Sequence, residues 1–325
     1  MTKDHFKYRK KRYEIINRIV LGRKTYLVTK QLSSGPRRRF LAFDPIASPG
    51  GALRVVQLMA NSRDAWQRVG VLHRLSQHNS ELPQILEFHR HRDEIGTVET
   101  WLEGKDLRWW IFKMRSSDRQ RLGAPESLRL FRQLAHAIHH VHRHCGVIHA
   151  DIKPANIIVN NRSRRLSLID FGSAWGVERT NRRQRGDGKS DIYAAPEVLT
   201  NRPGVNFRAD YFSLAAVCFE TLTLQLPYDG LGGRAGLPEY ESERDSLYLP
   251  PSILSPEKEK LARHLWAIID ELFAVSLSLK PSDRPVNGND WLAKWDRVVE
   301  QIQSKTPESL RSRLLASLVN WIERR

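Results

Sequence analysis

The sequence contains little cysteine and no long apolar run. Only two cysteines, Cys145 and Cys218, occur among its 325 residues, which is too few for a disulfide framework or a cysteine-based metal site. No stretch approaches the roughly 18 consecutive apolar residues that a membrane-spanning helix requires. The first residues also lack the apolar core of a signal peptide. These absences predict a cytoplasmic protein without a transmembrane segment.

Acidic residues are scarce relative to basic ones. Lysine and arginine number 53 against 36 aspartates and glutamates, which gives a net charge of +17. Such a surface attracts anions, so acidic proteins, nucleic acid and anionic lipid are all electrostatically suitable partners. The Cys/His spacings and ribonucleoprotein aromatics of nucleic-acid-binding modules are absent, which argues against nucleic acid as the main partner. We expect a protein substrate or regulator of acidic character.

Length and pattern predict one large bilobal domain or about two smaller ones. Residues 1–12 are predicted to form a basic tail, and residues 13–102 alternate in the manner of strands, with helix-like spacing over 63–76. Residues 103–302 are mainly helical in pattern. Residues 303–325 have the spacing of an amphipathic helix that can dock on the preceding domain, join a partner or lie on a membrane.

Two short polar stretches in the second half carry the chemistry. Asp151, Lys153 and Asn156 lie in the first, Asp170 lies in the second, and apolar residues typical of a hairpin separate them. Phosphoryl transfer needs a residue that orients the attacking hydroxyl, oxygen ligands for Mg²⁺ and fixed positive charge against the phosphate oxygens. Asp151 can orient the hydroxyl, Asn156 and Asp170 can supply the oxygen ligands, and Lys153 can supply the positive charge.

The same stretches carry a resemblance to a known family. Residues 149–156 read H-A-D-I-K-P-A-N and residues 170–172 read D-F-G, which resembles the H-R-D-x-K-P-x-N and D-F-G loops of the eukaryotic-type serine/threonine protein kinases. The resemblance implies an α+β, bilobal protein-kinase-like fold with a small, mainly β N-lobe (13–102) and a large, mainly α C-lobe (103–302). It also implies transfer of the ATP γ-phosphate to a serine or threonine hydroxyl.

The resemblance assigns a role to each polar residue. Asp151 would orient the hydroxyl and Lys153 would steady the phosphate, while Asn156 and Asp170 would hold Mg²⁺. Residues 194–197 resemble the A-P-E segment that closes the family's activation loop, and residues 281–285 resemble its late arginine motif. A buried ion pair between Glu197 and Arg284 is implied by those two motifs.

The first hundred residues depart from the family pattern. The glycine-rich loop, G-x-G-x-x-G, is reduced to Gly22, which Arg23 and Lys24 follow. The family's third-strand lysine and its glutamate partner are also missing. One alignment places Asp44 at the lysine and Arg68 at the glutamate, which reverses the pair, and a shifted alignment places Gln57 at the lysine. Neither alignment restores a lysine.

Two explanations of these departures stay open. In the first, Lys24 replaces the missing lysine and binds ATP together with Gly22, because residues 24–26 are similar to the sequence around the substitute lysine of the with-no-lysine kinases. In the second, the protein is a pseudokinase that acts as a partner-binding or regulatory scaffold. The complete set of polar residues in the second half favours the active enzyme.

The residue before the catalytic aspartate is also atypical. Ala150 stands where the family has an arginine that receives the activation-loop phosphate. We therefore expect activity that is independent of activation-loop phosphorylation. The basic segment 179–189 is suited instead to recruiting an acidic substrate or regulator.

Overall fold

The structure, a computed structural model, describes residues 4–35, 37–117, 121–160, 165–171, 174–176, 191–200, 204–244 and 246–304. The amphipathic helix expected at 303–325 lies outside these residues from position 305 onwards, as do the basic segment 179–189 and Gly172. The chain divides into two compact units. Unit 1 comprises Met1–Leu107, Ala137–Val147 and Ala155–Gly176, and unit 2 comprises Arg108–His136, Ile148–Pro154 and Val177–Arg325.

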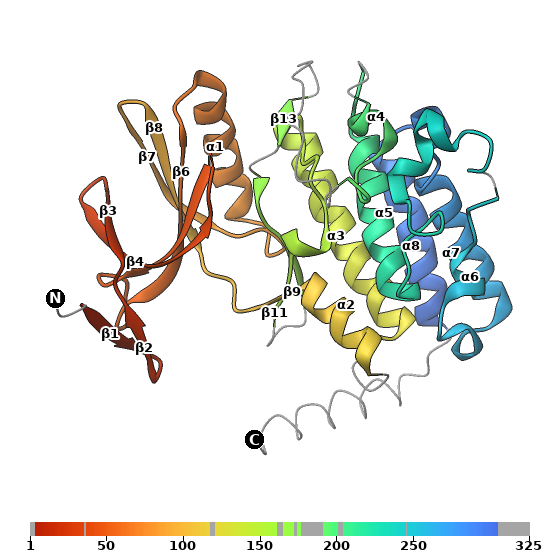
Figure 1. The fold of residues 1–325 in the computed structure, drawn as a ribbon, viewed down its shortest axis with the longest axis horizontal. Coiled ribbons are helices and arrows are strands. Elements are labelled where there is room, and N and C mark those ends of the chain that lie inside the picture. Colours follow the sequence, from red (N-terminus) through yellow and green to blue (C-terminus); the bar gives the residue numbers. More distant parts are fainter. Residues whose placement is uncertain are drawn as a thin grey trace. The chain divides into compact units, whose positions relative to one another are not determined.

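Unit 1 is built on a six-stranded antiparallel sheet with the strand order β3-β4-β5-β6-β8-β7. Its strands are β3 (Asn17–Leu21), β4 (Lys24–Ser33), β5 (Arg37–Asp44), β6 (Ala52–Ala60), β7 (Ile85–His91) and β8 (Glu94–Thr100). The helix α1 (Arg63–Ser76) follows β6, and Ser62 caps its N-terminus by accepting the Ala65 N–H with its side chain. Figure 1 shows α1 beside β6, β7 and β8.

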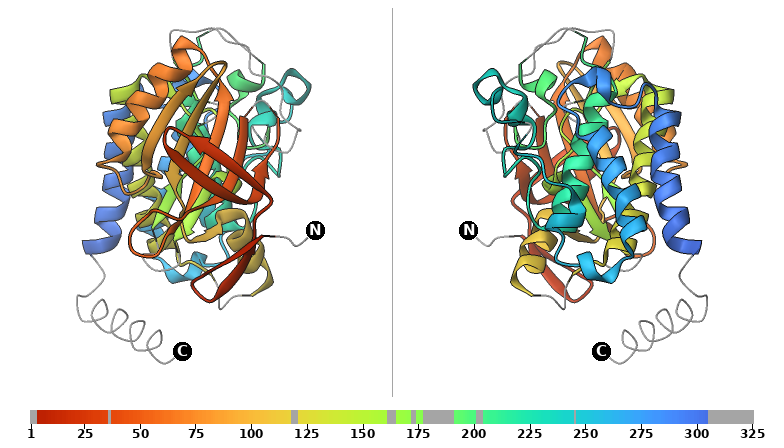
Figure 2. Two further views of the ribbon diagram at one scale, coloured as in Figure 1. Left: turned by 90° about the vertical axis from the view of Figure 1, so that its left-hand side faces the viewer. Right: turned by 90° about the vertical axis from the view of Figure 1, so that its right-hand side faces the viewer.

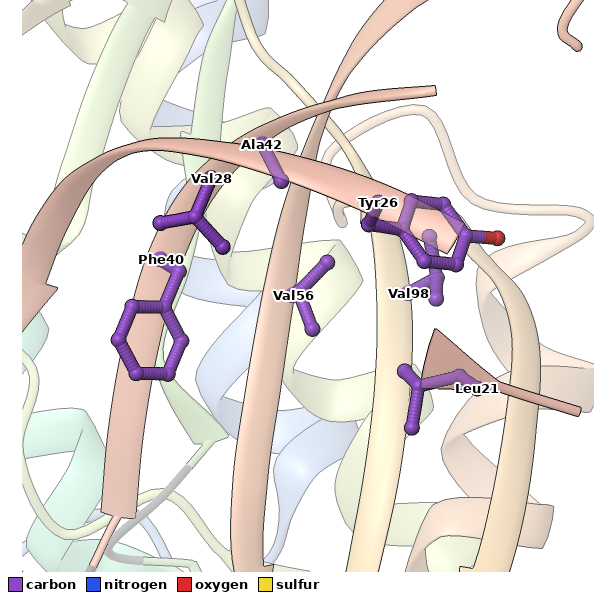
Figure 3. Close-up of a cluster of buried hydrophobic side chains, with 7 residues drawn as sticks. All are labelled: Leu21, Tyr26, Val28, Phe40, Ala42, Val56 and Val98. Atoms are coloured by element: carbon purple, nitrogen blue, oxygen red, sulfur yellow. The ribbon is translucent and has the colours of Figure 1, made fainter. Parts of the chain in front are cut away.

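Alternating side chains give this sheet two apolar faces. One face carries a buried cluster, drawn in Figure 3, that consists of Leu21, Tyr26, Val28, Phe40, Ala42, Val56 and Val98. On the other face, Ala65 and Val69 of α1 pack against Ile95 of β8. A polar side chain on the face that α1 covers therefore lies between the sheet and the helix.

A hairpin precedes the sheet in a region where the sequence predicted a basic tail. The strands β1 (His5–Tyr8) and β2 (Lys11–Glu14) pair with each other. Phe6 stacks on Tyr13 and also on Phe43 of β5. These aromatic contacts bury apolar surface in a stretch that its basic residues mark as solvated, which explains why charge alone did not indicate the hairpin.

Asn156 and Asp170 lie at the ends of a hairpin that belongs to a smaller sheet in unit 1. Its strand order is β12-β11-β9, where β9 is Gly104–Asp106, β11 is Ile157–Asn160 and β12 is Leu166–Leu168. The antiparallel pairing of β11 with β12 is the hairpin that the apolar residues predicted. The two-residue strands β10 (Val147–Ile148) and β13 (Trp175–Gly176) complete the strands of the described residues.

Unit 2 is helical, and α5 (Arg208–Thr223) lies at its centre. Every residue of α5 after Arg208 is buried, as expected of a helix that is apolar on all sides. Tyr211 stacks on Trp291 of α8 (Gly288–Ser304), and Phe219 meets Phe273 of α7 (Arg263–Ser276) edge to face. Figure 1 and Figure 2 show α5, α7 and α8 side by side.

The remaining helices are shorter or pass through both units. They are α2 (Leu107–Ser116), α3 (Ala124–Cys145), α4 (Pro196–Leu199), α6 (Pro251–Leu254) and the 3-10 turns η2 (Pro154–Asn156), η4 (Gly232–Gly236), η5 (Pro238–Tyr240), η6 (Lys258–Lys260) and η7 (Pro281–Asp283). Among the described residues no helix has the length and apolar character needed to cross a membrane. A mainly β N-terminal region followed by a helical C-terminal region confirms the predicted α+β class.

Candidate active site

Asp210 of α5 holds the backbone of the loop that carries Asp151. The Asp210 carboxylate, which is fully buried, accepts the His149 N–H at 2.7 Å and the Ala150 N–H at 2.9 Å. Ala150 has φ +59°, a left-handed conformation that non-glycine residues adopt at an energetic cost. Two charge-assisted hydrogen bonds to adjacent amides offset this strain. Asp210 therefore sets the loop's backbone without contributing a reacting group.

Asp151 and Lys153 meet on this loop. The Lys153 Nζ lies 2.9 Å from Asp151 Oδ2. The side chains are 24% and 14% exposed, respectively, so both remain accessible to a ligand. A partly exposed carboxylate beside an ammonium group can accept a hydrogen bond from a hydroxyl while the cation faces a phosphate. Unit 2 thus contains both residues to which the sequence assigned a catalytic role.

Asn156 and Asp170 belong to unit 1, at the two ends of the β11–β12 hairpin. The Asn156 carbonyl accepts the Ile169 N–H at 2.8 Å, which holds the residue before Asp170 against Asn156. Asp170 has φ +66°, a second left-handed residue at a predicted site position. Amide and carboxylate oxygens are the donors that Mg²⁺ takes from proteins. The residues present therefore fit the metal that the fold family implies.

An arginine that sequence reasoning missed pairs with Asp170. Arg39 of β5 places its Nη1 3.1 Å from Asp170 Oδ2, and its side chain is only 12% exposed. Arg39 lies directly across from Gln57 of β6 in the antiparallel register. Arg37 is two residues earlier in β5, and two residues is the strand repeat, so both arginines lie on one face of the sheet. Arg38 lies on the opposite face and pairs with Glu94.

A cavity lies between this face and α1. Arg37, Gln57, Arg68, Glu99 and Asp170 contribute its polar lining. Burial raises the pKa of the Glu99 carboxyl; the nearby Arg39 opposes the shift and Asp170 adds to it. Burial lowers the pKa of both Arg68 and Arg37, and the facing Arg68 lowers that of Arg37 further. Two pairs of like charge, Arg37 with Arg68 and Glu99 with Asp170, thus interact unfavourably among the residues that line the cavity.

The strand order decides where the family's lysine position falls. The strand that leads into α1 is β6, and the residue of β6 that lines the cavity beside Asp170 is Gln57. The shifted alignment with Gln57 therefore matches the structure. Asp44 ends β5, where its carboxylate accepts the Ile46 N–H, and Arg68 donates to the Ala174 carbonyl. These different contacts do not form the reversed pair that the first alignment suggested.

Gly22 and Lys24 lie where β3 turns into β4, at one edge of the six-stranded sheet. Gly22 forms the turn between β3 and β4 with φ +58°, where a side chain would also collide with the ring of His89. The Lys24 Nζ lies 3.0 Å from Glu87 Oε2 of β7. The Tyr26 hydroxyl donates to the same carboxylate. Neither Gly22 nor Lys24 lines the cavity beside Asp170, and their contact with ATP stays a prediction.

Glu99 makes stability depend on pH. Its folded-state pKa is raised above the ordinary value of 4.5, so folding favours the neutral carboxyl. The stability it contributes is fully present below the unfolded-state pKa and is lost as the pH rises through the higher folded-state pKa. We expect Glu99→Gln, which is neutral at every pH, to lessen the fall in the free energy of unfolding between about pH 5 and pH 8.

Urea denaturation of the two proteins at both pH values measures this effect. Glu94→Gln is the matched control, because Glu94 lies on the same strand and pairs with Arg38 at an exposed position. The control is expected to keep the wild-type pH dependence. An unchanged pH dependence in Glu99→Gln would show that another group is responsible.

Comparisons with known proteins agree with this arrangement. Residues 54–292 match the family model described as the protein kinase domain. The chain is 26% identical over 228 residues to the probable serine/threonine-protein kinase HSL1 of Saccharomyces cerevisiae, covering 68% of this chain and 14% of the relative. It is 30% identical over 238 residues to a Wee1-like protein kinase of Oryza sativa subsp. japonica, covering 67% and 42%.

A solved structure matches the fold as well. The granulovirus kinase PK-1 of Cydia pomonella aligns with a TM-score of 0.62 at 18% identity, over 82% of this chain and 92% of that one. The chain spans less than half the length of the curated relatives named above.

Proposed function

Because this chain belongs to the protein kinase domain family, we propose that it transfers the γ-phosphate of ATP to serine or threonine hydroxyls of a protein. The observation that carries the proposal is the Asp151–Lys153 pair on a loop whose backbone Asp210 holds. Asn156 and Asp170 complete the requirement as oxygen donors joined through the β11–β12 hairpin.

Each residue has a defined task in this reaction. Asp151 accepts the proton of the substrate hydroxyl and orients its oxygen toward the γ-phosphorus, while Lys153 stabilises charge on the phosphate oxygens. The new oxygen–phosphorus bond forms as the bond to the β-phosphate oxygen breaks, and ADP leaves. Asn156 and Asp170 would hold Mg²⁺, which supplies positive charge to the phosphates when bound.

The proposal includes independence from activation-loop phosphorylation. Ala150 cannot receive a phosphate as the family's arginine does, and its backbone N–H is already bonded to Asp210. The loop geometry is therefore supported by a permanent carboxylate instead of an added phosphate. The net charge of +17 favours an acidic segment as the protein substrate or regulator.

A second candidate function is a pseudokinase scaffold that binds partners. Its support is the pairing of Asp170 with Arg39, which occupies one oxygen of the expected metal ligand. Gln57 in place of the lysine weakens the grip on phosphate in the same region. Under this alternative the cavity would bind no Mg²⁺–ATP.

One experiment separates the two candidates. The purified protein is incubated with ATP labelled at the γ-phosphate, with an acidic and a neutral protein substrate, in Mg²⁺ or in EDTA. We expect label on serine or threonine only with Mg²⁺, and equal rates after phosphatase treatment of the protein. Absence of transfer to itself and to both substrates would reject the enzyme in favour of the scaffold.

A further inference from the structure

One of the cations that line the cavity beside α1 is Arg37. Among the residues that the structure describes, the Arg37 guanidinium makes no hydrogen bond or ion pair, although Arg37 lines the cavity. Arg38, the next residue, is paired with Glu94 on the opposite face. A guanidinium group carries five N–H donors, and leaving them unbonded in a partly buried site is unfavourable. Arg37 is therefore poised to donate to a bound group.

A second arginine faces the same space from the helix. Arg68 donates one guanidinium N–H to the Ala174 carbonyl, which positions the group while leaving further donors for a ligand. Arg68 is close enough to Arg37 to lower the pKa of the Arg37 guanidinium further below the value set by burial. Two like charges held close together in a partly buried site repel each other, so an anion between them would relieve the repulsion.

The nearby carboxyls neutralise this pair only in part, although Asp170 does favour the charged form of Arg37. The Asp170 carboxylate is bonded to Arg39, and the raised pKa of Glu99 favours its neutral form. Three guanidinium groups, those of Arg37, Arg39 and Arg68, thus stand against at most two negative charges. These groups therefore carry a net positive charge, which a bound anion would neutralise.

The chemistry of the surroundings identifies the class of anion. A guanidinium fork matches the oxygens of phosphate in a bidentate manner, better than an ammonium point charge does. Asp170, which lines the same cavity, is one of the two oxygen donors suited to Mg²⁺. A ligand that satisfies both arginines and a neighbouring metal ion is a polyphosphate chain.

We propose that Arg37 and Arg68 form a polyphosphate-binding pair that grips the phosphates of the nucleotide from the sheet and from α1. They supply the charge that the family takes from its third-strand lysine, which Gln57 has replaced here. Naming ATP as the source of the polyphosphate rests on the proposed function. Because the pair supplies two fixed positive charges, binding persists when Mg²⁺ is removed.

The test uses the full chain and two probes, ATP and inorganic tripolyphosphate, titrated by calorimetry in EDTA and in Mg²⁺. Arg37→Gln and Arg68→Gln are each expected to weaken both probes at least tenfold in EDTA. Arg38→Gln is the matched control, on the same strand but the opposite face, and is expected to stay within about twofold of wild type. Arg37→Lys, which keeps the charge but loses the fork, is expected to fall between wild type and Arg37→Gln.

Lys24→Met tests the competing cation. Unchanged affinity in that variant together with loss in Arg37→Gln and Arg68→Gln supports the pair. The converse pattern overturns it and returns the role to Lys24. Urea midpoints equal to wild type confirm that each variant is folded, and Arg37→Lys serves where a glutamine variant fails this check.

The outcomes also separate this inference from the proposed function. Failure of wild type to bind either probe in EDTA overturns the pair, even if phosphate transfer occurs in Mg²⁺. Binding that requires both arginines but leads to no transfer supports the pair and rejects the enzyme. Tripolyphosphate binding without ATP binding also supports the pair, and identifies an inorganic or terminal polyphosphate as its ligand.

Discussion

Asp151→Asn is expected to lower phosphate transfer by about 10³-fold, while nucleotide affinity and the free energy of unfolding stay close to wild type. The asparagine amide has the same shape but does not take the proton of the hydroxyl. The loop keeps its backbone because Asp210 holds the N–H groups of His149 and Ala150, and Asp151 has no part in those bonds. The substitution is therefore expected to slow the reaction without changing the stability of the fold.

The rate of label transfer at saturating ATP measures this effect, alongside a nucleotide titration and a urea unfolding curve. Asp229→Asn is the matched control, since Asp229 is an exposed aspartate of the same unit and tolerates the left-handed backbone equally well as asparagine. A variant that retains more than about a tenth of the wild-type rate would remove Asp151 from the role of base.

The predictions that succeeded concern residues close together in the sequence. The β11–β12 hairpin follows from two apolar runs across a polar turn, and Asp151 and Lys153 share one loop because only two residues separate them in the sequence. The buried pair of Glu197 with Arg284 spans 87 residues. It was reached only because both motifs resemble those of a known family.

The predictions that failed or were missed depend on strand register. Residues 40–44 and 55–58 are both apolar strands, so the sequence alone left open which one corresponds to the family's third strand. A shift of one residue moves every side chain to the other face of a sheet, and the contact of Arg39 with Asp170 exists only in the observed register. Nothing in the local sequence distinguishes Glu99 from an ordinary strand residue. Its environment depends on the pairing of β8 with β6.

The same limit applies to the residues that hold the site without reacting. Asp210 was visible as the start of an expected helix, but nothing local marked its carboxylate as the acceptor for a loop 60 residues earlier. Its complete burial is the physical sign of such a role, because a buried carboxylate requires partners. Buried charges at helix starts are therefore candidates for positioning residues.

Arg284→Met is expected to lower the free energy of unfolding by about 3 to 5 kcal/mol, the largest effect on stability among these variants. Arg284 Nη1 and Nη2 donate to the two Glu197 carboxylate oxygens at 2.7 and 3.0 Å. Arg284 is 1% exposed and Glu197 is 7% exposed. Removing the arginine leaves a buried carboxylate without its counter-charge and frees the Ser278 carbonyl, which also accepts from Arg284.

Urea denaturation measures the loss, and two further variants interpret it. Lys294→Met breaks the exposed ion pair with Glu271 in the same unit and is expected to cost less than about 1 kcal/mol. The double variant Glu197→Leu/Arg284→Met removes both buried charges, so it is expected to recover part of the stability that Arg284→Met loses. A loss below about 1 kcal/mol in Arg284→Met would contradict a structural role for the pair.

Loss of the Glu197–Arg284 ion pair is expected to affect stability more than the rate of phosphate transfer. Glu197 lies in α4, the element that follows residues 194 and 195 and begins at Pro196. The stability loss in Arg284→Met should therefore reduce phosphate transfer only in proportion to the folded fraction and to any displacement of α4. Under conditions where the variant is fully folded, its transfer rate is expected to exceed that of Asp151→Asn by at least about tenfold, because the side chain of Arg284 donates its hydrogen bonds to Glu197, Ser278 and Arg208.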